Sequence, residues 1–133
     1  AKALLKMWVR NKVVNYLGEV RDVRPFIAEA DCIVLPSYRE GLPRVLLEAA
    51  AMARPVIATD VEGCRDVIVH GVTGLLCKAR DWKMLADSME KYINLSLDQR
   101  IKMGLRAREK VEKEFDEKLV INSYMQIING FDH

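Results

Sequence analysis

The stretch that decides the fold reads IVLPSYREGLPRVLLEAAAMARPVIAT and covers residues 33–59. Its first residues, Ile33-Val34-Leu35, are aliphatic and stop at a proline, which is typical of a short buried strand. A helical stretch is expected at about residues 43–53, and Val56-Ile57-Ala58-Thr59 after Pro55 predicts a second strand. A strand, a helix and a second apolar strand in this order indicate two parallel strands joined by a crossover helix.

The same alternation extends in both directions along the chain. Short apolar segments predict strands at residues 13–17 and 75–77, and helices are expected at about residues 23–29 and 64–69. Strands that are apolar on both faces and separated by helices are typical of a parallel sheet covered by helices on both faces. We therefore predict an α/β, Rossmann-like fold.

The pattern changes after residue 77, where apolar residues recur at helical spacing with no further strand. Extra helices are expected at residues 81–95, 97–114 and 116–129. A chain of 133 residues, half of them hydrophobic, fits one globular domain with a single core, so residues 1–133 are interpreted as one domain.

Composition excludes several classes of protein. The formal net charge of +2 is too small to indicate a nucleic-acid-binding protein. We find no apolar run near the roughly 20 residues that span a bilayer, and no signal peptide, so a cytoplasmic location is expected. Cys32, Cys64 and Cys77 are widely spaced and are expected to be small buried residues without a disulfide or a metal site. Trp8 and Trp82 are expected to be packing residues.

The loop at residues 36–42 is the place where chemistry is expected, because open α/β sheets bind ligands at the carboxyl ends of their strands. Pro43 suits the first turn of the following helix, and the free N–H groups of Arg44 and Val45 would then point out of its positive end. Such an end binds anions. Gly41 would let the backbone approach a ligand, and Arg44 would add a cation for a diphosphate.

Two acids frame this segment. Glu40 lies in the loop, and Glu48 lies about a turn and a half inside the helix, so the pair could hold opposite ends of one ligand. A carboxylate accepts two hydrogen bonds from a vicinal diol, which ribose and hexose rings both offer. The alternative is that Glu40 is a solvated loop acid and Glu48 a surface acid of the helix.

The residues at 36–66 resemble the E-x7-E region of glycosyltransferase family 4, and those at 70–76 are similar to the glycine-containing turn that follows it in the family. The resemblance covers about residues 13–95. It implies the C-terminal, nucleotide-sugar-binding half of a retaining enzyme with the GT-B fold, whose acceptor-binding N-terminal domain would lie outside this chain.

The resemblance also implies residue roles. Glu40 matches the acid that contacts the donor sugar near the reacting centre and is the candidate catalytic residue, while Glu48 matches the acid that binds the ribose. The backbone at Gly41 and Leu42 matches the part that meets the sugar and the diphosphate. Pro43 departs from the glycine of many members and removes one amide donor.

Two further parts of the family's site fall near the start of the chain. The loop containing Gly18 and Val20 matches the one near the nucleotide base. The Arg and Lys that neutralise the departing diphosphate in the family would lie before Val13, outside this chain.

The activity implied is transfer of a hexose or N-acetylhexosamine from a nucleotide sugar, in particular a UDP-sugar, to a saccharide or lipid-linked acceptor with retention, in polysaccharide biosynthesis. The resemblance implies no metal and no cofactor. The chain alone is expected to be inactive, because the acceptor domain supplies half of the active site. Two alternatives remain: another GT-B enzyme such as a UDP-sugar epimerase, and a non-enzymatic Rossmann-like interaction domain.

The helix expected at residues 97–114 has a basic side. It could contact anionic lipid at the inner face of the membrane, which would make the protein a peripheral one. The interleaved glutamates favour an ordinary solvated helix face. The basic residues are Arg100, Lys102, Arg106, Arg108, Lys110 and Lys113, and the glutamates are Glu109, Glu112 and Glu114.

Overall fold

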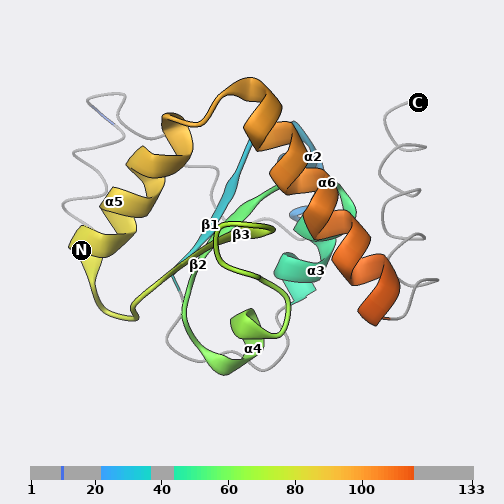
Figure 1. The fold of residues 1–133 in the computed structure, drawn as a ribbon, viewed down its shortest axis with the longest axis horizontal. Helices are drawn as coiled ribbons and strands as arrows, with labels where there is room; N and C mark the ends of the chain where they lie inside the picture. The colour runs from blue at the N-terminus through green and yellow to red at the C-terminus, as the bar shows by residue number, and fades with distance from the viewer. Residues whose placement is uncertain (1–9, 11–21, 37–43, 116–133) are drawn as a thin grey trace.

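The computed structural model describes residues 10, 22–36 and 44–115 (Figure 1). Within them lies a parallel sheet in the order β1-β2-β3, formed by β1 (Ile33–Leu35), β2 (Val56–Thr59) and β3 (Gly74–Cys77). All three strands match predicted strands, and β3 begins one residue before its predicted start at residue 75. The strand predicted at residues 13–17 lies outside the described residues.

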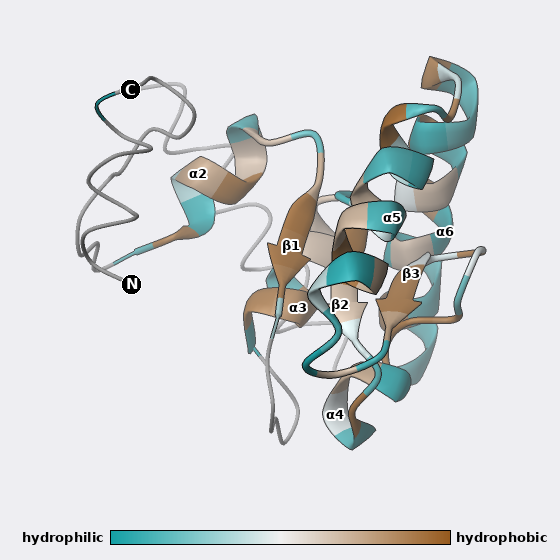
Figure 2. Ribbon diagram, turned by 90° about the vertical axis from the view of Figure 1, so that its left-hand side faces the viewer, coloured by the Kyte–Doolittle hydropathy of each residue, from teal (hydrophilic) through white to brown (hydrophobic). Residues whose placement is uncertain are grey.

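Helices cover both faces of this sheet, as predicted. Helix α5 (Trp82–Ile93) packs on β2 and β3 from one side, and α3 (Arg44–Ala51) and α6 (Leu97–Glu114) lie on the other (Figures 1 and 2). Helix α2 (Arg24–Glu29) packs beside α3. These helices end within two residues of the predicted limits, while the helix predicted at residues 116–129 lies outside the described part.

All four residues of β2 are buried because a separate apolar cluster covers each face of the strand. Val56 and Ala58 belong to the cluster that includes residues of α3 and α6. Ile57, whose side chain points the other way, packs with Leu75 of β3 and Tyr92 of α5. In Figure 2 the strands are mostly brown, whereas much of the outer surface of α5 and α6 is teal. The two-sided burial explains the continuous apolar strands in the sequence.

Specific residues determine where helix α6 begins and where it passes close to another segment. The Ser96 hydroxyl accepts a hydrogen bond from the Gln99 amide at 3.1 Å, and the Gln99 side chain accepts one from the Ser96 amide at 2.9 Å, which forms a capping box. Further along, a Cβ on Gly104 would lie 2.0 Å from the carbonyl oxygen of Ala53. The helix therefore passes so close to the α3–β2 connection that only glycine fits.

The helix predicted at residues 64–69 was misplaced. The structure has α4 at Glu62–Arg65, because the chain leaves β2 through an extended Val61 and turns into a helix immediately. Val67 and Ile68 are then buried in the core. The backbone N–H of Val69 donates a hydrogen bond to the Thr73 hydroxyl at 2.8 Å, so the helix does not continue to this residue.

Two expectations about burial also need correction. Trp82 is 62% exposed, because it is the first residue of α5 and projects at the sheet edge, whereas Ser88 and Tyr92 form the buried side of that helix. Cys64 is buried as expected, but Cys32 is only partly buried. Trp8 lies outside the described residues.

Candidate functional site

A cavity of about 370 Å³ lies between the beginnings of α2 and α3. Helix α3 follows the carboxyl end of β1, and α2 leads back to the amino end of β1, so both helices begin at the carboxyl edge of the sheet. This is the edge at which the sequence predicted a ligand. The lining residues are Asp22, Val23, Arg24, Arg44, Val45 and Glu48.

Glu48 is a buried acid of this cavity. The residue is 8% exposed, and its Oε1 accepts a hydrogen bond from Nε of Arg44 at 3.1 Å. A solvated surface acid, the alternative considered for Glu48, does not fit this burial. Burying a carboxylate costs free energy unless it is paired, and the bond from Arg44 uses one of about four acceptor positions. With respect to the described residues, Glu48 therefore retains the capacity to accept further hydrogen bonds.

Arg44 lies at the solvent side of the cavity. Its side chain is 77% exposed, whereas the side chain of its partner Glu48 is only 10% exposed. A guanidinium carries five N–H donors, so it can bind an incoming anion while it stays paired with Glu48. Arg44 and Val45 are also the first two residues of α3, so their N–H groups have no acceptor within the helix. Both features favour an anion at this end of the cavity.

Asp22 and Arg24 were not singled out from the sequence. Arg24 Nε donates to Asp22 Oδ1 at 2.9 Å and Arg24 Nη2 to Asp22 Oδ2 at 2.8 Å, which is a two-point ion pair. The side-chain hydrogen bond from Arg24 lowers the pKa of Asp22 to about 2. The Asp-x-Arg spacing before Pro25 was the available signal, because an acid just ahead of a helix often bonds to its first turn.

The cavity combines two kinds of chemistry. At the start of α3 it offers backbone N–H groups and the Arg44 cation, with Arg24 nearby, and deeper in the helix it offers the carboxylate of Glu48. The first kind suits a phosphate or diphosphate, and the second suits a diol. One ligand with both groups would match the arrangement.

Several predicted site residues lie outside the described residues, and their roles stay predictions. These residues are Gly18, Val20, Glu40, Gly41 and Leu42. Among the described residues we find no group of three or more His, Cys, Asp or Glu side chains arranged to hold a metal ion.

The basic side of α6 is largely neutralised by acids one turn away. The pairs are Lys102 with Asp98 at 2.9 Å, Arg108 with Glu112 at 2.7 Å, Lys113 with Glu109 at 2.7 Å, and Lys110 with Glu114. This pattern favours a solvated helix face over a lipid-binding one. In the part of the chain that the structure describes, no helix is both long and apolar enough to cross a bilayer.

The parallel three-stranded sheet covered by helices has the α/β architecture of GT-B glycosyltransferases, which is the class of protein that the fold indicates. Comparison with known protein families leads to the same class of protein. The family described as "Glycosyl transferases group 1" matches residues 1–94, and the chain belongs to this family.

Individual relatives show the same similarity. The chain is 32% identical over 124 residues to the capsular polysaccharide biosynthesis glycosyltransferase CapM of Staphylococcus aureus, covering 92% of this chain and 32% of CapM. It is 38% identical over 116 residues to N-acetyl-alpha-D-glucosaminyl L-malate synthase of Bacillus anthracis, covering 86% of this chain and 30% of the synthase.

Among solved structures, HepE of Anabaena in complex with UDP superimposes with a TM-score of 0.77 at 24% identity, covering 98% of this chain and 36% of HepE. At that identity the likeness concerns the fold. The chain spans about a third of the length of these relatives.

Proposed function

We propose that this chain is the donor-binding half of a retaining glycosyltransferase that transfers a hexose or N-acetylhexosamine from a UDP-sugar to a saccharide or lipid-linked acceptor. The observation that carries the proposal is the buried carboxylate of Glu48 in one cavity with Arg24, Arg44 and the start of α3. HepE, which shares the fold, was solved with UDP and with UDP-glucose, and CapM acts in capsular polysaccharide biosynthesis.

The ligand would be held at two points. Glu48 would accept hydrogen bonds from the 2′ and 3′ hydroxyls of the ribose. The N–H groups of Arg44 and Val45, with the two guanidiniums, would neutralise the diphosphate. Residues near Gly18 and Val20 would meet the base, and Gly41 and Leu42 would approach the sugar through their backbones.

The reaction needs a stabilised leaving group above all. A nucleoside diphosphate departs from the anomeric carbon while an acceptor hydroxyl attacks the same face, and a partial positive charge develops on the sugar ring. Fixed dipoles and cations aimed at the departing oxygen lower the activation free energy of this step. The N–H groups and the arginine side chains near the start of α3 would supply part of this stabilisation. Glu40 would orient the donor sugar and would not act as the nucleophile.

The rest of the active site would come from a second, acceptor-binding domain of the complete protein. We place the reaction in the cytoplasm, and the free thiols of Cys32, Cys64 and Cys77 suit such a reducing compartment. Peripheral contact with the inner face of the membrane would then involve surfaces other than the ion-paired side of α6.

The test compares UDP with 2′-deoxy-UDP by calorimetric titration of the complete protein. If Glu48 binds the ribose diol, removing the 2′ hydroxyl should weaken binding about tenfold, the equivalent of 1.4 kcal/mol. In Glu48→Gln, UDP should bind at least about tenfold more weakly, and the penalty for the deoxy analogue should largely disappear. Glu90→Gln, a change at an exposed acid of α5, is the control and should behave like the unchanged protein. An undiminished deoxy penalty in Glu48→Gln would remove Glu48 from the ribose site.

Activity assays separate the remaining alternatives. The complete protein should transfer sugar from a UDP-sugar with retained anomeric configuration, read by proton NMR of the product. Glu40→Ala should reduce turnover at least about a hundredfold while leaving UDP affinity nearly unchanged, because the sugar contact operates mainly in the transition state. An epimerised UDP-sugar would indicate an epimerase, and UDP binding without any turnover would indicate a non-enzymatic domain.

A further inference from the structure

A cavity of about 170 Å³ lies at the amino edge of the sheet, opposite the edge that carries the proposed donor cavity. Asp31 and Pro55, which precede β1 and β2, line it from one side, and the end of α5 and the first half of α6 line it from the other. In Figure 1 the connection between α5 and α6 lies at the top of the molecule, whereas α4, which follows β2, lies at the bottom. No residue lines both this cavity and the cavity with Glu48.

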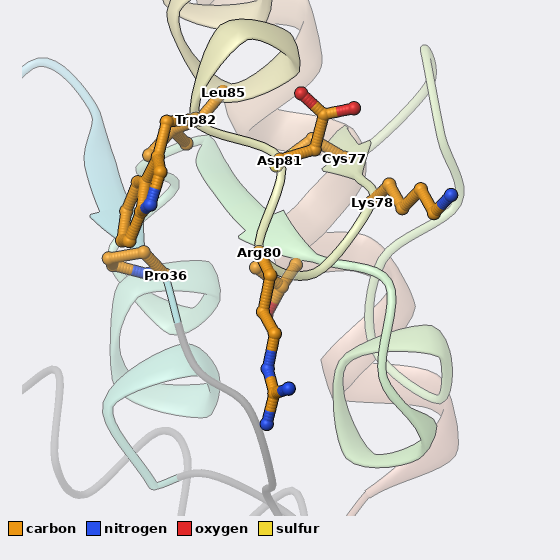
Figure 3. Close-up of a pocket in the computed structure, with 8 residues that line it drawn as sticks. Pro36, Cys77, Lys78, Arg80, Asp81, Trp82 and Leu85 are labelled. Carbon is orange, nitrogen blue, oxygen red and sulfur yellow. The ribbon is translucent and has the colours of Figure 1, made fainter.

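The size of this cavity distinguishes it from the hollow at the carboxyl ends of the strands, beside Pro36 and Trp82 (Figure 3). That hollow has a volume of about 10 Å³, which is room for about one water molecule. By the same measure the cavity at the amino edge has room for a small polyatomic ion.

Two arginines that line this cavity have unused hydrogen-bond donors. Nη2 of Arg54 donates to the carbonyl oxygen of Ala28 at 2.6 Å, and Nη2 of Arg100 donates to the carbonyl oxygen of Ile93. The Nε atom of each guanidinium is buried and has no hydrogen-bond partner, and no other described side chain has a buried polar atom in this state. Such a donor is costly in free energy, and a bound water or ion is one of its ordinary explanations.

The charges of the two guanidiniums are also unpaired. Among the described residues neither arginine forms an ion pair, although Asp31 lines the same cavity. The Cζ of Arg100 lies 5.3 Å from the centre of the Tyr92 ring, and the Tyr92 hydroxyl donates to the carbonyl oxygen of Asp31 at 3.0 Å. These contacts hold Arg100 in place without an anionic partner. Two like charges beside one cavity repel each other, and an anion between them would turn this repulsion into attraction.

An apolar stripe of α6 forms part of the wall of this cavity. Leu97, Ile101 and Leu105 follow one another at intervals of four residues, all three line the cavity, and each is more than half exposed. An anion between the arginines would therefore have an exposed apolar surface next to it. This surface suits a ligand whose anionic group carries a nonpolar part.

We propose that Arg54 and Arg100 form a binding site for a phosphate monoester at the amino edge of the sheet. A phosphate monoester carries a charge of about −1.5 to −2 and three acceptor oxygens, which match two guanidiniums, whereas a carboxylate carries one charge. The phosphate belongs either to a soluble phosphorylated molecule or to the headgroup of a phosphatidic acid in a membrane. The site is separate from donor binding, so it does not rest on the proposed function.

The soluble source is tested by calorimetric titration of the complete protein with glycerol 3-phosphate, inorganic phosphate and acetate. Both phosphates should bind at least about tenfold more tightly than acetate. The membrane source is tested by cosedimentation with phosphatidylcholine vesicles that contain phosphatidic acid, or phosphatidylglycerol at the same surface charge. Phosphatidic acid should bind at least about tenfold more tightly than phosphatidylglycerol, whose phosphate is a diester. Preference in one arm alone identifies the source.

The variants locate the site. Arg54→Gln and Arg100→Gln should each weaken the preferred phosphate at least about tenfold, and the losses of binding free energy should not add in the double variant, because one anion contacts both residues. Arg54→Lys and Arg100→Lys keep the charge and should bind more tightly than the glutamine variants, which a merely misfolded protein would not show. Arg106→Gln removes the same charge from an exposed position of α6 outside this cavity and is the matched control.

Each other outcome overturns the phosphate site. No preference for phosphates over acetate together with no preference for phosphatidic acid would show that the arginines do not recognise a phosphate monoester. An equal loss in Arg106→Gln would show attraction to surface charge in general. Phosphate affinity that persists in Arg54→Gln and Arg100→Gln would place the phosphate elsewhere. Failure of UDP to bind would contradict the donor site alone, so the two proposals fail by different measurements.

Discussion

At the scale of single residues, the side chain of Asp22 is held by three hydrogen bonds from Arg24, one from its backbone N–H at 3.0 Å and two from its guanidinium. These bonds favour the charged carboxylate and depress its pKa. They also fix the direction of the Arg24 guanidinium in the cavity between the beginnings of α2 and α3, which is the proposed donor cavity. The exposed pair thus acts mainly by orienting a cation.

The pKa of Asp22 is therefore a direct readout of this contact. It is expected at about 2 in place of the ordinary 3.8, and Arg24→Gln should return it toward 3.8. Because the folded-state pKa is depressed, the pair contributes stability above about pH 3.8, and this contribution is lost as the pH falls through about 2.

A carboxyl carbon NMR titration of the isolated chain measures this pKa. Arg65→Gln, which removes the separate 2.6 Å ion pair of Arg65 with Asp60, is the control and should leave the Asp22 titration unchanged. A pKa that stays near 2 in Arg24→Gln would show that Arg24 is not its cause.

At the scale of elements, the crossing of α6 over the α3–β2 connection joins the two sides of the molecule. Met103 of α6 belongs to the apolar cluster with Ile57, while Ala107 and Val111 belong to the cluster on the other face of the sheet. This crossing is possible because Gly104 has no Cβ, which would otherwise meet the carbonyl oxygen of Ala53. The packing of α6 therefore stabilises both faces.

Gly104→Ala should be destabilising, although alanine is the better helix former by about 1 kcal/mol. The added Cβ would lie 2.0 Å from the carbonyl oxygen of Ala53, which is backbone and cannot move aside cheaply. We expect a loss of about 1–3 kcal/mol in the free energy of unfolding, measured by urea denaturation. Leu105→Ala, at the next position and 55% exposed, should change it by less than about 1 kcal/mol. A stabilised Gly104→Ala would contradict the close crossing.

At the scale of the whole molecule, the donor cavity is open at the edge of the sheet and is formed by the beginnings of two helices. The chain also spans only about a third of its relatives. We propose that the complete protein closes this edge with its acceptor-binding domain. Donor binding by this chain and sugar transfer by the complete protein can then be measured separately.

The 133-residue chain on its own is expected to bind UDP with at least about tenfold weaker affinity than the complete protein and to transfer no sugar. The reason is that contacts to the diphosphate and the acceptor would be divided between two domains. Calorimetry and a sugar-transfer assay on both forms measure this difference. Transfer by the isolated chain would show that residues 1–133 already contain the complete active site.

Local signals in the sequence predicted the described strands and helices to within about two residues, apart from α4. The aliphatic residues before Pro36 predicted β1, and the predicted limits of α6, residues 97–114, agree with the structure. Such signals are readable because capping, periodicity and proline effects act between residues a few positions apart. The same reasoning selected Arg44, Val45 and Glu48, which the structure brings into one cavity.

Tertiary structure decided what depends on distant neighbours. The place of Arg24 in the donor cavity follows from the packing of α2 beside α3, and Trp82 is exposed because α5 begins at the rim of the sheet. Gly104 is required only because the α3–β2 connection passes beside it. Burial and close approach arise between segments far apart in the chain, so no local pattern of residues encodes them.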